Sequence, residues 1–547
     1  MTVPCPPGPL LDAAMTEAAS VSPTHPSDLS GLIDTHDRPL ALLSVADLRA
    51  LEVSAAATLP PHELMARAGR AAALFLTAQI ASARSSGSAS AVWIVAGPGN
   101  NGGDALVVAT ELHIAGIAVE VCMPLEVKPE DARWALAEAR AAGVPISNSA
   151  PDSFERFGWL VDGMFGIGLT RPLEGVFATL AQQLSQRAKR QGQVLALDVP
   201  SGLDSDTGNV VGAGTGVRAT HTVTFIGAKP GLFMAAGRDL AGAVTVAPIG
   251  LDTAAAAPAP RSGGVQLNAP ALFAPFLPPR DFSTNKGSFG SLAVVGGDTG
   301  MCGAPILAAR AALHCGAGKI HVALLGAGAP PYDPPHPELM LHAIDYLPLD
   351  KMDALAIGCG MGHRDRAIQA LHDVLPLDVP KLLDADALNL IANDPALAAK
   401  VAARGAKGDP CVLTPHPLEA ARLLGCDVPA VQRDRLAAAR ALSARFASVI
   451  VLKGTGTVVG APDGRLAVNP TGNAALATGG TGDVLGGIIG ALLAQRLPPY
   501  EAALAGVYLH GFAADTLTAQ GDGPAGLTAG ELAPTVRKLL NRMFYPA

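Results

Sequence analysis

The chain has 547 residues, of which 49% are hydrophobic and 16% charged, and its formal net charge is −8. This length predicts two to four domains with large buried cores, and the composition excludes general disorder. The acidic balance, without a visible basic stripe, argues against nucleic acid as a partner.

The cysteines and the beginning of the chain indicate the compartment. The seven cysteines are scattered, odd in number and include no CxxC pair, which argues against a disulfide framework and a zinc site. No basic segment followed by an apolar one opens the chain, and no apolar run reaches transmembrane length. We therefore expect a soluble, cytoplasmic protein. Residues 1–40, rich in Pro, Ser, Thr and Asp, are predicted to be a disordered tail or a start assigned too far upstream, with order beginning near Leu42.

Helices and strands alternate in the next part of the chain. Segments 44–56 and 61–81 predict helices, and 91–97 (AVWIVAG), which is apolar and ends in glycine, predicts a buried parallel strand. Further helices and strands are predicted at 105–116, 119–124, 159–166, 178–190, 194–202 and 219–228. Such alternation predicts a doubly wound sheet that binds ligands at the carboxyl ends of its strands.

A low-complexity segment separates this series from a second one. Residues 252–266 (DTAAAAPAPRSGGVQ) are the predicted linker, because they are rich in Ala, Pro and Gly. A second alternating series begins with SLAVVGG at 291–297 and continues to the final helices. The sequence therefore predicts two α/β domains, at 41–251 and 267–547.

The first glycine-rich loop, Gly97–Asp104 (GPGNNGGD), follows a predicted strand and opens a helix. It matches GxGxxG, and Glu120 stands roughly where a ribose-binding acid would be, so a nicotinamide dehydrogenase is one interpretation. Asp104 counts against it, because its carboxylate would face a pyrophosphate at the helix N-terminus. The two asparagines add side-chain oxygens that such a loop does not need.

Two further loops place an acid at the end of a strand. Asp162 ends WLVD before a glycine-rich loop, and Asp198 ends VLALD before VPSGLD. One such acid is usually a cap or an Asx-turn, but three loops of this kind in one small domain favour a functional site. Amide, hydroxyl and carboxylate oxygens suit a hard cation.

The motifs GNNGGDALVVA, DGMFGIGLTRPLEG, LALDVPSGLDSDTG and VRATHTVTFIGAKPGLF, across about residues 45–251, resemble the NAD(P)H-hydrate epimerase family, with one departure at Ala105. The resemblance implies that Asp198 accepts or donates a proton while the R and S hydrates interconvert at C6. It also implies a potassium ion held by Asn101, Asp162 and Ser201. The hydrated nucleotide would contact Asp198 and the following residues: Asn100, Asn101, Gly102, Gly103, Asp104, Gly166, Ile167, Gly168, Leu169, Thr170, Arg171 and Pro172.

A second candidate site lies near the end of the chain, where Gly479-Gly480-Thr481-Gly482-Asp483 stands directly before the apolar run VLGGIIGALLAQ. Small residues and the positive end of a following helix favour an anion. A carboxylate would repel a phosphate unless it transfers a proton, so Asp483 predicts a base beside a phosphate chain. The alternative is a helix cap, since Asp is a preferred N-cap. Lys453–Thr457 (KGTGT) adds a cation and flexible backbone suited to nucleotide phosphates.

Across about residues 270–540, the motifs VVGGDTGMCGAPILAARAALHCGAGKIHV, GCGMG, LLDADALNLI, LTPHPLEAARLLG, VLKGTGTVV and GNAALATGGTGDVLGGIIGAL resemble the NAD(P)H-hydrate dehydratase family. The resemblance implies a ribokinase-like fold, magnesium and ADP as co-substrate, with Asp483 as the base and Gly480–Gly482 as an anion hole. The hydrate would contact Ala304, Gly360, His416 and Asp483. ADP would contact Lys453, Gly454, Thr455, Gly456, Thr457, Asn473, Ala474, Ala475, Leu476, Ala477, Thr478, Gly479, Gly480, Thr481 and Gly482.

Three further histidines are expected to be structural. His314 and His321 flank an apolar helix and strand, and His510 lies on a helix close to the end of the chain. A lone histidine more often packs than binds, but the position of His416 between two prolines after a strand favours a functional role.

Three functions remain open at this stage. The favoured one is a bifunctional repair enzyme that epimerises R and S NAD(P)HX and then dehydrates the S form with ADP, giving NAD(P)H, AMP and phosphate. The alternatives are a ribokinase-like vitamin-precursor or sugar kinase fused to a non-catalytic binding domain, and a scaffold that has lost its site. Repair is favoured because Asp104, Asp162 and Asp198 are all present and because a kinase has no use for an NNGGD domain.

The favoured function brings further expectations. It implies an N-terminal Rossmann-like three-layer α/β/α domain and a C-terminal ribokinase-like α/β domain. The expected partners are the small molecules NADHX, NADPHX and ADP, with neither nucleic acid nor a membrane. The family likeness also implies a homo-oligomer, a tetramer or larger.

Overall fold

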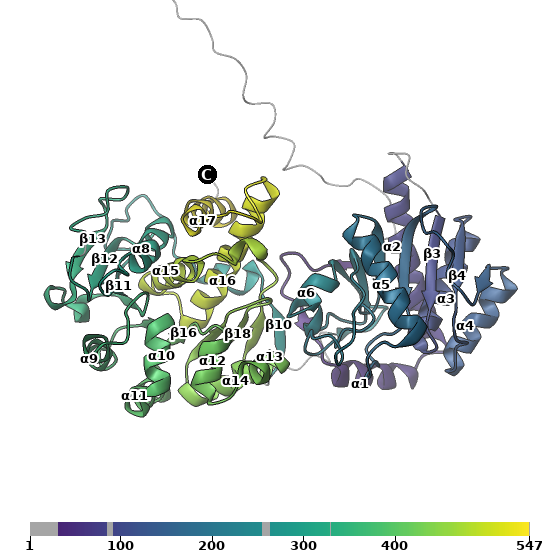
Figure 1. The fold of residues 1–547 in the computed structure, drawn as a ribbon, viewed down its shortest axis with the longest axis horizontal. Helices are drawn as coiled ribbons and strands as arrows, with labels where there is room; N and C mark the ends of the chain where they lie inside the picture. Colours follow the sequence, from purple (N-terminus) through teal and green to yellow (C-terminus); the bar gives the residue numbers. More distant parts are fainter. Residues whose placement is uncertain (1–30, 85–90, 254–262, 329, 546–547) are drawn as a thin grey trace, which may run out of the picture.

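The computed structural model of the chain describes residues 31–84, 91–253, 263–328 and 330–545. Two α/β bodies lie side by side, the first in purple to blue and the second in teal to yellow (Figure 1). Each is built around its own sheet, of eight strands in the first body and eleven in the second. Among the described helices, none combines the length and apolar character needed to cross a bilayer.

The eight-stranded sheet is parallel except for its first strand. In sheet order its strands are β1 (Ile33–Asp34), β9 (Ala243–Ala247), β8 (His221–Phe225), β7 (Gln193–Leu197), β6 (Phe157–Gly163), β3 (Ala91–Ala96), β4 (Val119–Cys122) and β5 (Ile146–Ser147). Only β1 runs antiparallel, to β9. This body also contains helices α1 (Val45–Ala56), α2 (Glu63–Arg84), α3 (Asn100–Ile114), α4 (Glu130–Ala141), α5 (Gly175–Lys189) and α6 (Gly237–Leu240).

Alternation along β3 explains why helices cover both faces of this sheet. Val92 and Ile94 belong to a buried cluster with α2, α3 and α4, whereas Trp93 and Val95 belong to one with α5. Successive residues of a strand point to opposite faces, so an entirely apolar strand needs cover on both sides. The result is three layers, α/β/α, as predicted.

The eleven-stranded sheet is mostly parallel. In sheet order its strands are β13 (Met340–Ala343), β12 (Lys319–Leu324), β11 (Ser291–Gly296), β14 (Ala354–Ile357), β15 (Lys381–Leu383), β16 (Val412–Leu413), β17 (Val449–Leu452), β18 (Val458–Gly460), β19 (Leu466–Val468), β10 (Val265–Leu267) and β2 (Ala41–Leu42). One face is covered by α8 (Gly303–His314), α15 (Thr481–Ala494), α16 (Pro499–Ala519) and α17 (Ala529–Phe544). The other is covered by α9 (Asp365–Val374), α10 (Ala385–Asn393), α11 (Pro395–Ala406), α12 (Pro417–Leu424), α13 (Val428–Arg433) and α14 (Arg435–Phe446).

The beginning of the chain departs from the prediction of a tail at 1–40. Ile33 and Asp34 form β1 and pair with β9, so order begins before Leu42; residues 1–30 lie outside the described residues. Ala41 and Leu42 then form β2, which pairs with β10 in the other body. The first described segment therefore contributes a strand to each sheet, and the assignment of residues 41 and 42 to the first domain alone is wrong.

The predicted linker, 252–266, is too long at its C-terminal end. Val265 and Gln266 belong to β10, which pairs in parallel with β19. Residues 254–262 lie outside the described part of the chain.

The two bodies contact each other directly. The Arg238 guanidinium donates a hydrogen bond to the Gly472 carbonyl at 2.9 Å, and the Ala235 amide donates one to the Thr455 carbonyl at 3.1 Å. A cavity of about 840 Å³ also lies at this junction, lined by residues of both bodies. None of the predicted site residues lines it.

Candidate functional site

Three adjacent strands of the first body bring the predicted acids together. The strands β3, β6 and β7 are neighbours in the sheet, so the loops at their carboxyl ends meet. Asn101 lies in the first turn of α3 and donates a hydrogen bond to the Leu197 carbonyl at 3.2 Å. Asp162 accepts hydrogen bonds from the Ser201 hydroxyl at 2.6 Å and the Ser201 amide at 2.8 Å.

This cluster has the character of a cation site. Asn101 Oδ1 is buried and accepts no hydrogen bond from the described residues, although buried polar atoms are normally paired. Burial raises the pKa of Asp162 to about 6, in spite of hydrogen bonds from Ser201 and Met164 that lower it. At the same sheet edge, an orphaned amide oxygen, a buried carboxylate and a hydroxyl offer oxygen ligands to a hard cation.

Asp198 sits directly after β7 in a strained conformation and in contact with a lysine. Its φ is +66°, in the left-handed region. Its Oδ1 accepts a hydrogen bond from Lys229 Nζ at 2.7 Å, and its Oδ2 accepts one from the Ile167 amide at 3.2 Å. A Cβ on Gly166 would lie 2.8 Å from Oδ2, so only glycine allows this close approach.

Two more acids face Asp198. Burial raises the pKa of Asp104 well above its usual value, and the charges of Asp198 and Glu52 raise it further. Burial, followed by the charge of Asp198, likewise raises the pKa of Glu52. The loop after β7, the start of α3 and α1 therefore share one acidic pocket, which Lys229 partly neutralises.

The predicted epimerase residues are not all near this pocket. Asn101, Gly102 and Gly103 are buried, whereas Asn100 is exposed at the start of α3. Gly102 packs against the backbone of Gly97, where a Cβ would meet the carbonyl oxygen at 1.8 Å. In the loop after β6, Gly166 and Ile167 contact Asp198, Leu169 is half-buried, and the exposed members are Gly168, Thr170, Arg171 and Pro172.

Lys229 and Glu52 were missed by sequence reasoning. Lys229 stands in the AKPG segment, four residues after the end of β8, and a lysine between an apolar strand and Pro-Gly was an available signal. Glu52 lies on α1, far from the strand ends in sequence, and no motif points to it.

The second cluster surrounds the N-terminus of α15. The N-cap of this helix is Gly480, with a φ of +92° and no side-chain cap, so the reading of Asp483 as a helix cap is wrong. Asp483 lies in the first turn, half-buried, where burial raises its pKa and a hydrogen bond from the Cys359 thiol lowers it. Its side chain therefore faces the protein, next to the GCGMG loop.

Lys453 lies at the same helix end. A Cβ on Gly482 would lie 3.8 Å from Lys453 Nζ, which brings the two predicted ADP segments together. The ammonium forms an ion pair with Asp384 at 2.7 Å and lies 3.9 Å from a Glu419 carboxyl oxygen. Burial opposes its charge, but Asp384 and Glu419 outweigh burial and raise the pKa of Lys453.

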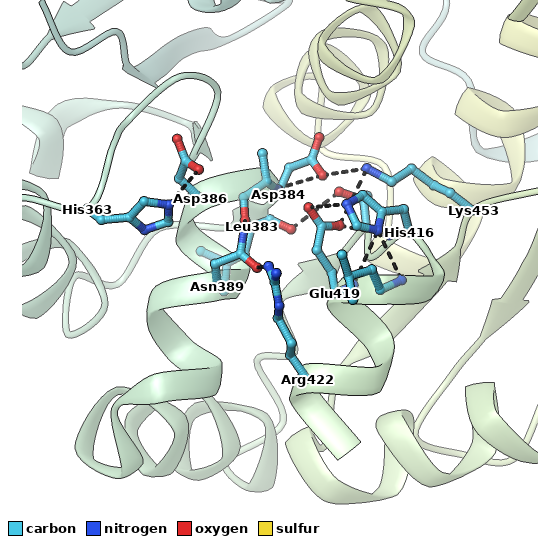
Figure 2. A network of polar contacts seen from close by, with 12 residues as sticks. His363, Leu383, Asp384, Asp386, Asn389, His416, Glu419, Arg422 and Lys453 are labelled. Atoms are coloured by element: carbon cyan, nitrogen blue, oxygen red, sulfur yellow. Dashed lines mark hydrogen bonds and ion pairs between the residues drawn. The ribbon is translucent and has the colours of Figure 1, made fainter. Parts of the chain in front are cut away.

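Figure 2 shows Lys453, Asp384, His416 and Glu419 pointing toward one another. Glu419 is 3% exposed, and burial raises its pKa to about 7 although Lys453 lowers it. His416 caps α12: its Nδ1 accepts hydrogen bonds from the Leu418 amide at 3.1 Å and the Glu419 amide at 3.2 Å. His416 thus has a structural role, and its contact with substrate stays a prediction.

The other residues predicted on the hydrate side are close together. A Cβ on Gly360 would lie 3.3 Å from the Ala304 Cβ, and Gly360 directly follows Cys359, the partner of Asp483. The structure therefore brings Ala304, Gly360 and Asp483 to one place, at the ends of β14, α8 and α15.

The predicted ADP residues differ in accessibility. Asn473 donates to Asp515 at 2.8 Å and caps the short helix at 474–476. Ala475 and Gly456 are buried, the first in the core and the second against the Phe233 carbonyl of the other body, so neither offers an open surface. The exposed members are Gly454, Thr455, Ala474, Ala477, Thr478 and Gly479.

His314 and His321 contact other histidines, whereas His510 lies in the core against the backbone of Thr481, at the start of α15. His321 contacts His342 at 3.2 Å, and His314 packs edge-on against His336. His510 is 7% exposed, and burial lowers its pKa to about 4. These surroundings are those of packed side chains.

Comparison with known proteins assigns both halves of the chain. A family model described as NAD(P)H-hydrate dehydratase matches residues 292–537, and one described as YjeF-related protein N-terminus matches residues 61–231. The bifunctional NAD(P)H-hydrate repair enzyme Nnr of Escherichia coli is 39% identical over 488 residues, 88% of this chain and 90% of that protein. The ADP-dependent (S)-NAD(P)H-hydrate dehydratase of Neisseria meningitidis is 48% identical over 264 residues, 48% of this chain and 88% of that protein.

A solved structure is also similar to the second half. The ADP/ATP-dependent NAD(P)H-hydrate dehydratase of Bacillus subtilis, co-crystallised with ATP and Mg²⁺, is 32% identical, with a TM-score of 0.44, and the match covers 50% of this chain and 98% of that one. The predicted fold class and both predicted families are confirmed. Since the Escherichia coli relative is matched over nine tenths of its length, the chain belongs to the family of bifunctional NAD(P)H-hydrate repair enzymes.

Proposed function

We propose that the chain epimerises R and S NAD(P)HX at the first site and dehydrates the S form with ADP at the second. The observation that supports this most directly is at the N-terminus of α15. Asp483 lies in its first turn, and Lys453 Nζ lies 3.8 Å from the Cβ position of Gly482. A base, a cation and free helix amides at one place are what phosphoryl transfer requires.

The dehydration proceeds in two steps. Asp483 accepts the proton of the C6 hydroxyl, whose oxygen attacks the β-phosphorus of ADP, and the bond from this phosphorus to the bridging oxygen breaks to release AMP. The phosphate then leaves C6 with the electrons of the carbon–oxygen bond and takes up a proton from the adjacent ring carbon, which restores the double bond of NAD(P)H. Lys453 and the amides of Gly480–Gly482 stabilise the negative charge on the transferring group.

Magnesium fits the charge balance of this site. Asp384, Glu419 and Asp483 are three acids around the ammonium of Lys453, so carboxyl groups outnumber the cation before any phosphate enters. Asp384 and Glu419 offer the carboxylate oxygens that a hard divalent cation prefers. When bound, the ion would neutralise the phosphate oxygens of the nucleotide.

The epimerisation requires only proton transfer. C6 bears both a hydroxyl and the ring nitrogen, so loss of the hydroxyl proton to Asp198 allows the carbon–nitrogen bond to break, with a proton returning to nitrogen. Closure on the other face then gives the opposite epimer. Asn101, Asp162 and Ser201 would hold a potassium ion beside the substrate, which the orphaned Asn101 Oδ1 supports.

Two further proposals come from the family resemblance and the cysteine pattern. We propose a cytoplasmic protein that forms a homo-oligomer, a tetramer or larger. Size-exclusion chromatography with light scattering measures the mass directly. A monomer at micromolar concentration would contradict the proposed homo-oligomer.

The function is tested with racemic hydrated NADPH, magnesium and either ADP or ATP. Absorbance at the reduced-cofactor band should recover completely, since the epimerase feeds the S form to the dehydratase. AMP and phosphate should appear in equal amounts when ADP is used. A vitamin-precursor or sugar kinase would leave the absorbance unchanged and phosphorylate an added alcohol instead.

A further inference from the structure

Lys229 is among the most deeply buried charged groups of the described residues. It follows β8 and is 1% exposed. Its ammonium donates three hydrogen bonds, each of 2.7 Å, to Asp198 Oδ1, Thr224 Oγ1 and the Phe225 carbonyl. An ammonium has three donors, so all of them are used. A buried charge persists only when it is paired and hydrogen-bonded in this way.

The two oxygens of Asp198 have different surroundings. Oδ1 faces inward to Lys229, while Oδ2 faces the loop after β6, where the Ile167 amide donates to it and Gly166 approaches it closely. This loop is the one proposed above to hold the hydrated nucleotide. Oδ2 is therefore the oxygen on the substrate side, and the lysine occupies the other.

We propose that Lys229 is a positioning residue of the epimerase site: it holds Asp198 through Oδ1, supplies its countercharge and turns its Oδ2 toward the substrate. This rests on the proposed role of Asp198. Lys229 itself does not contact the substrate, because it is buried and its three donors are engaged. Asp198 is the base, and the lysine acts through it.

The electrostatic need for Lys229 comes from the other acids in the pocket. Without the ammonium, Asp198 would face the carboxyl groups of Glu52 and Asp104 with no cation bonded to it. The charged and titratable groups that face this pocket are Glu52 and Arg49 on α1, Asp104 on α3, Asp131 on α4 and Lys229. Of the two cations, only Lys229 bonds to Asp198.

The decisive measurement is the pH profile of epimerisation by Lys229→Met in the full chain. We expect kcat at neutral pH to fall strongly with little change in KM, and the acid limb of the profile to move upward by about 1–3 pH units, the effect of one close opposite charge. Lys189→Met, on the exposed face of α5, is the matched control and should behave as the wild type. Dehydration of the pure S form should continue, which reports a folded second domain.

Thr224→Val supplies a second, milder variant. It removes one of the three acceptors of Lys229 and should shift the acid limb in the same direction by less. If Lys229→Met does not fold, the pH profile of Thr224→Val tests the positioning role of Lys229 instead. A profile that keeps the wild-type limb while activity falls equally at every pH overturns the inference.

Asp198→Asn separates this inference from the function on which it rests. If Asp198→Asn still epimerises rapidly, the proposed role of Asp198 fails, and the role of Lys229 fails with it. If Asp198→Asn is inactive and the Lys229 and Thr224 variants show no shift, only the positioning role is wrong.

Discussion

The two proposed catalytic acids differ in what accompanies them. Asp198 has a cation bonded to it, Lys229, within a pocket of further acids. Asp483 has none of its own, because the nearby Lys453 is paired with Asp384 and lies close to Glu419. The first site thus contains the countercharge of its base within the chain. The second has more acids than cations around a helix N-terminus, so the proposed magnesium ion would have to supply the countercharge for the nucleotide.

The largest effect is expected for a variant that inactivates the second site alone. Asp483→Asn removes the base, and we expect dehydration to fall by about 10²–10⁴-fold, the usual contribution of a general base, while epimerisation continues. Recovery of absorbance from the pure S form measures dehydration, and equilibration of the pure R form measures epimerisation. Asp373→Asn, an exposed acid on α9, is the control. Survival of both activities in Asp483→Asn would show that another group is the base.

Asp198→Ala should inactivate the first site alone. We expect epimerisation to fall by a similar factor of about 10²–10⁴, so that only the S half of a racemic mixture is consumed rapidly. The remaining R form should then disappear at the slow uncatalysed rate. Complete and rapid consumption of the racemate by this variant would refute the role of Asp198. Together with Asp483→Asn, this variant tests whether the two activities are separable.

The positions of many site residues could be predicted from the sequence, since acids at the ends of strands have a recognisable sequence pattern. Short apolar runs ending in Asp before Gly or Pro placed Asp162, Asp198 and the loop before Asp104 at one sheet edge, and the structure brings them together. Gly480 and Asp483 were placed at a helix N-terminus for the same kind of reason, because small residues preceded a long apolar run.

The side-chain partners were not accessible in the same way. Lys229, Glu52 and Asp384 reach their acids from other elements, and such pairings depend on packing rather than on local pattern. The strand β2 is a similar case: two apolar residues carry no signal of the sheet they join. The family resemblance also placed Ala475 at the nucleotide, although the fold buries its side chain in the core.

Potassium should distinguish the two sites, because it is proposed for the first site only. Replacing it with a large organic cation should weaken epimerisation by about 10–100-fold, the range typical of disturbed metal surroundings, and leave dehydration of the S form unchanged. Asn101→Ala, which removes the orphaned Oδ1, should make the epimerase insensitive to this replacement. Equal epimerase rates with both cations in the wild type would remove the ion from the scheme.

The smallest expected effect concerns the contact between the two bodies. Gly456 has a φ of +66°, and a Cβ there would lie 2.2 Å from the Phe233 carbonyl oxygen of the first body. Gly456→Ala must therefore displace either the KGTGT loop or the segment that follows Lys229, at a cost of about 1–3 kcal/mol in stability. Because that loop includes the proposed ADP ligands, the KM for ADP should rise while kcat for epimerisation changes little. Gly530→Ala, in α17 with open space around its Cβ position, is the control and should not lower the melting temperature. A Gly456→Ala variant with unchanged melting temperature and KM would show that the junction is looser than this contact implies, and that the nucleotide loop of the second site is positioned without help from the first body.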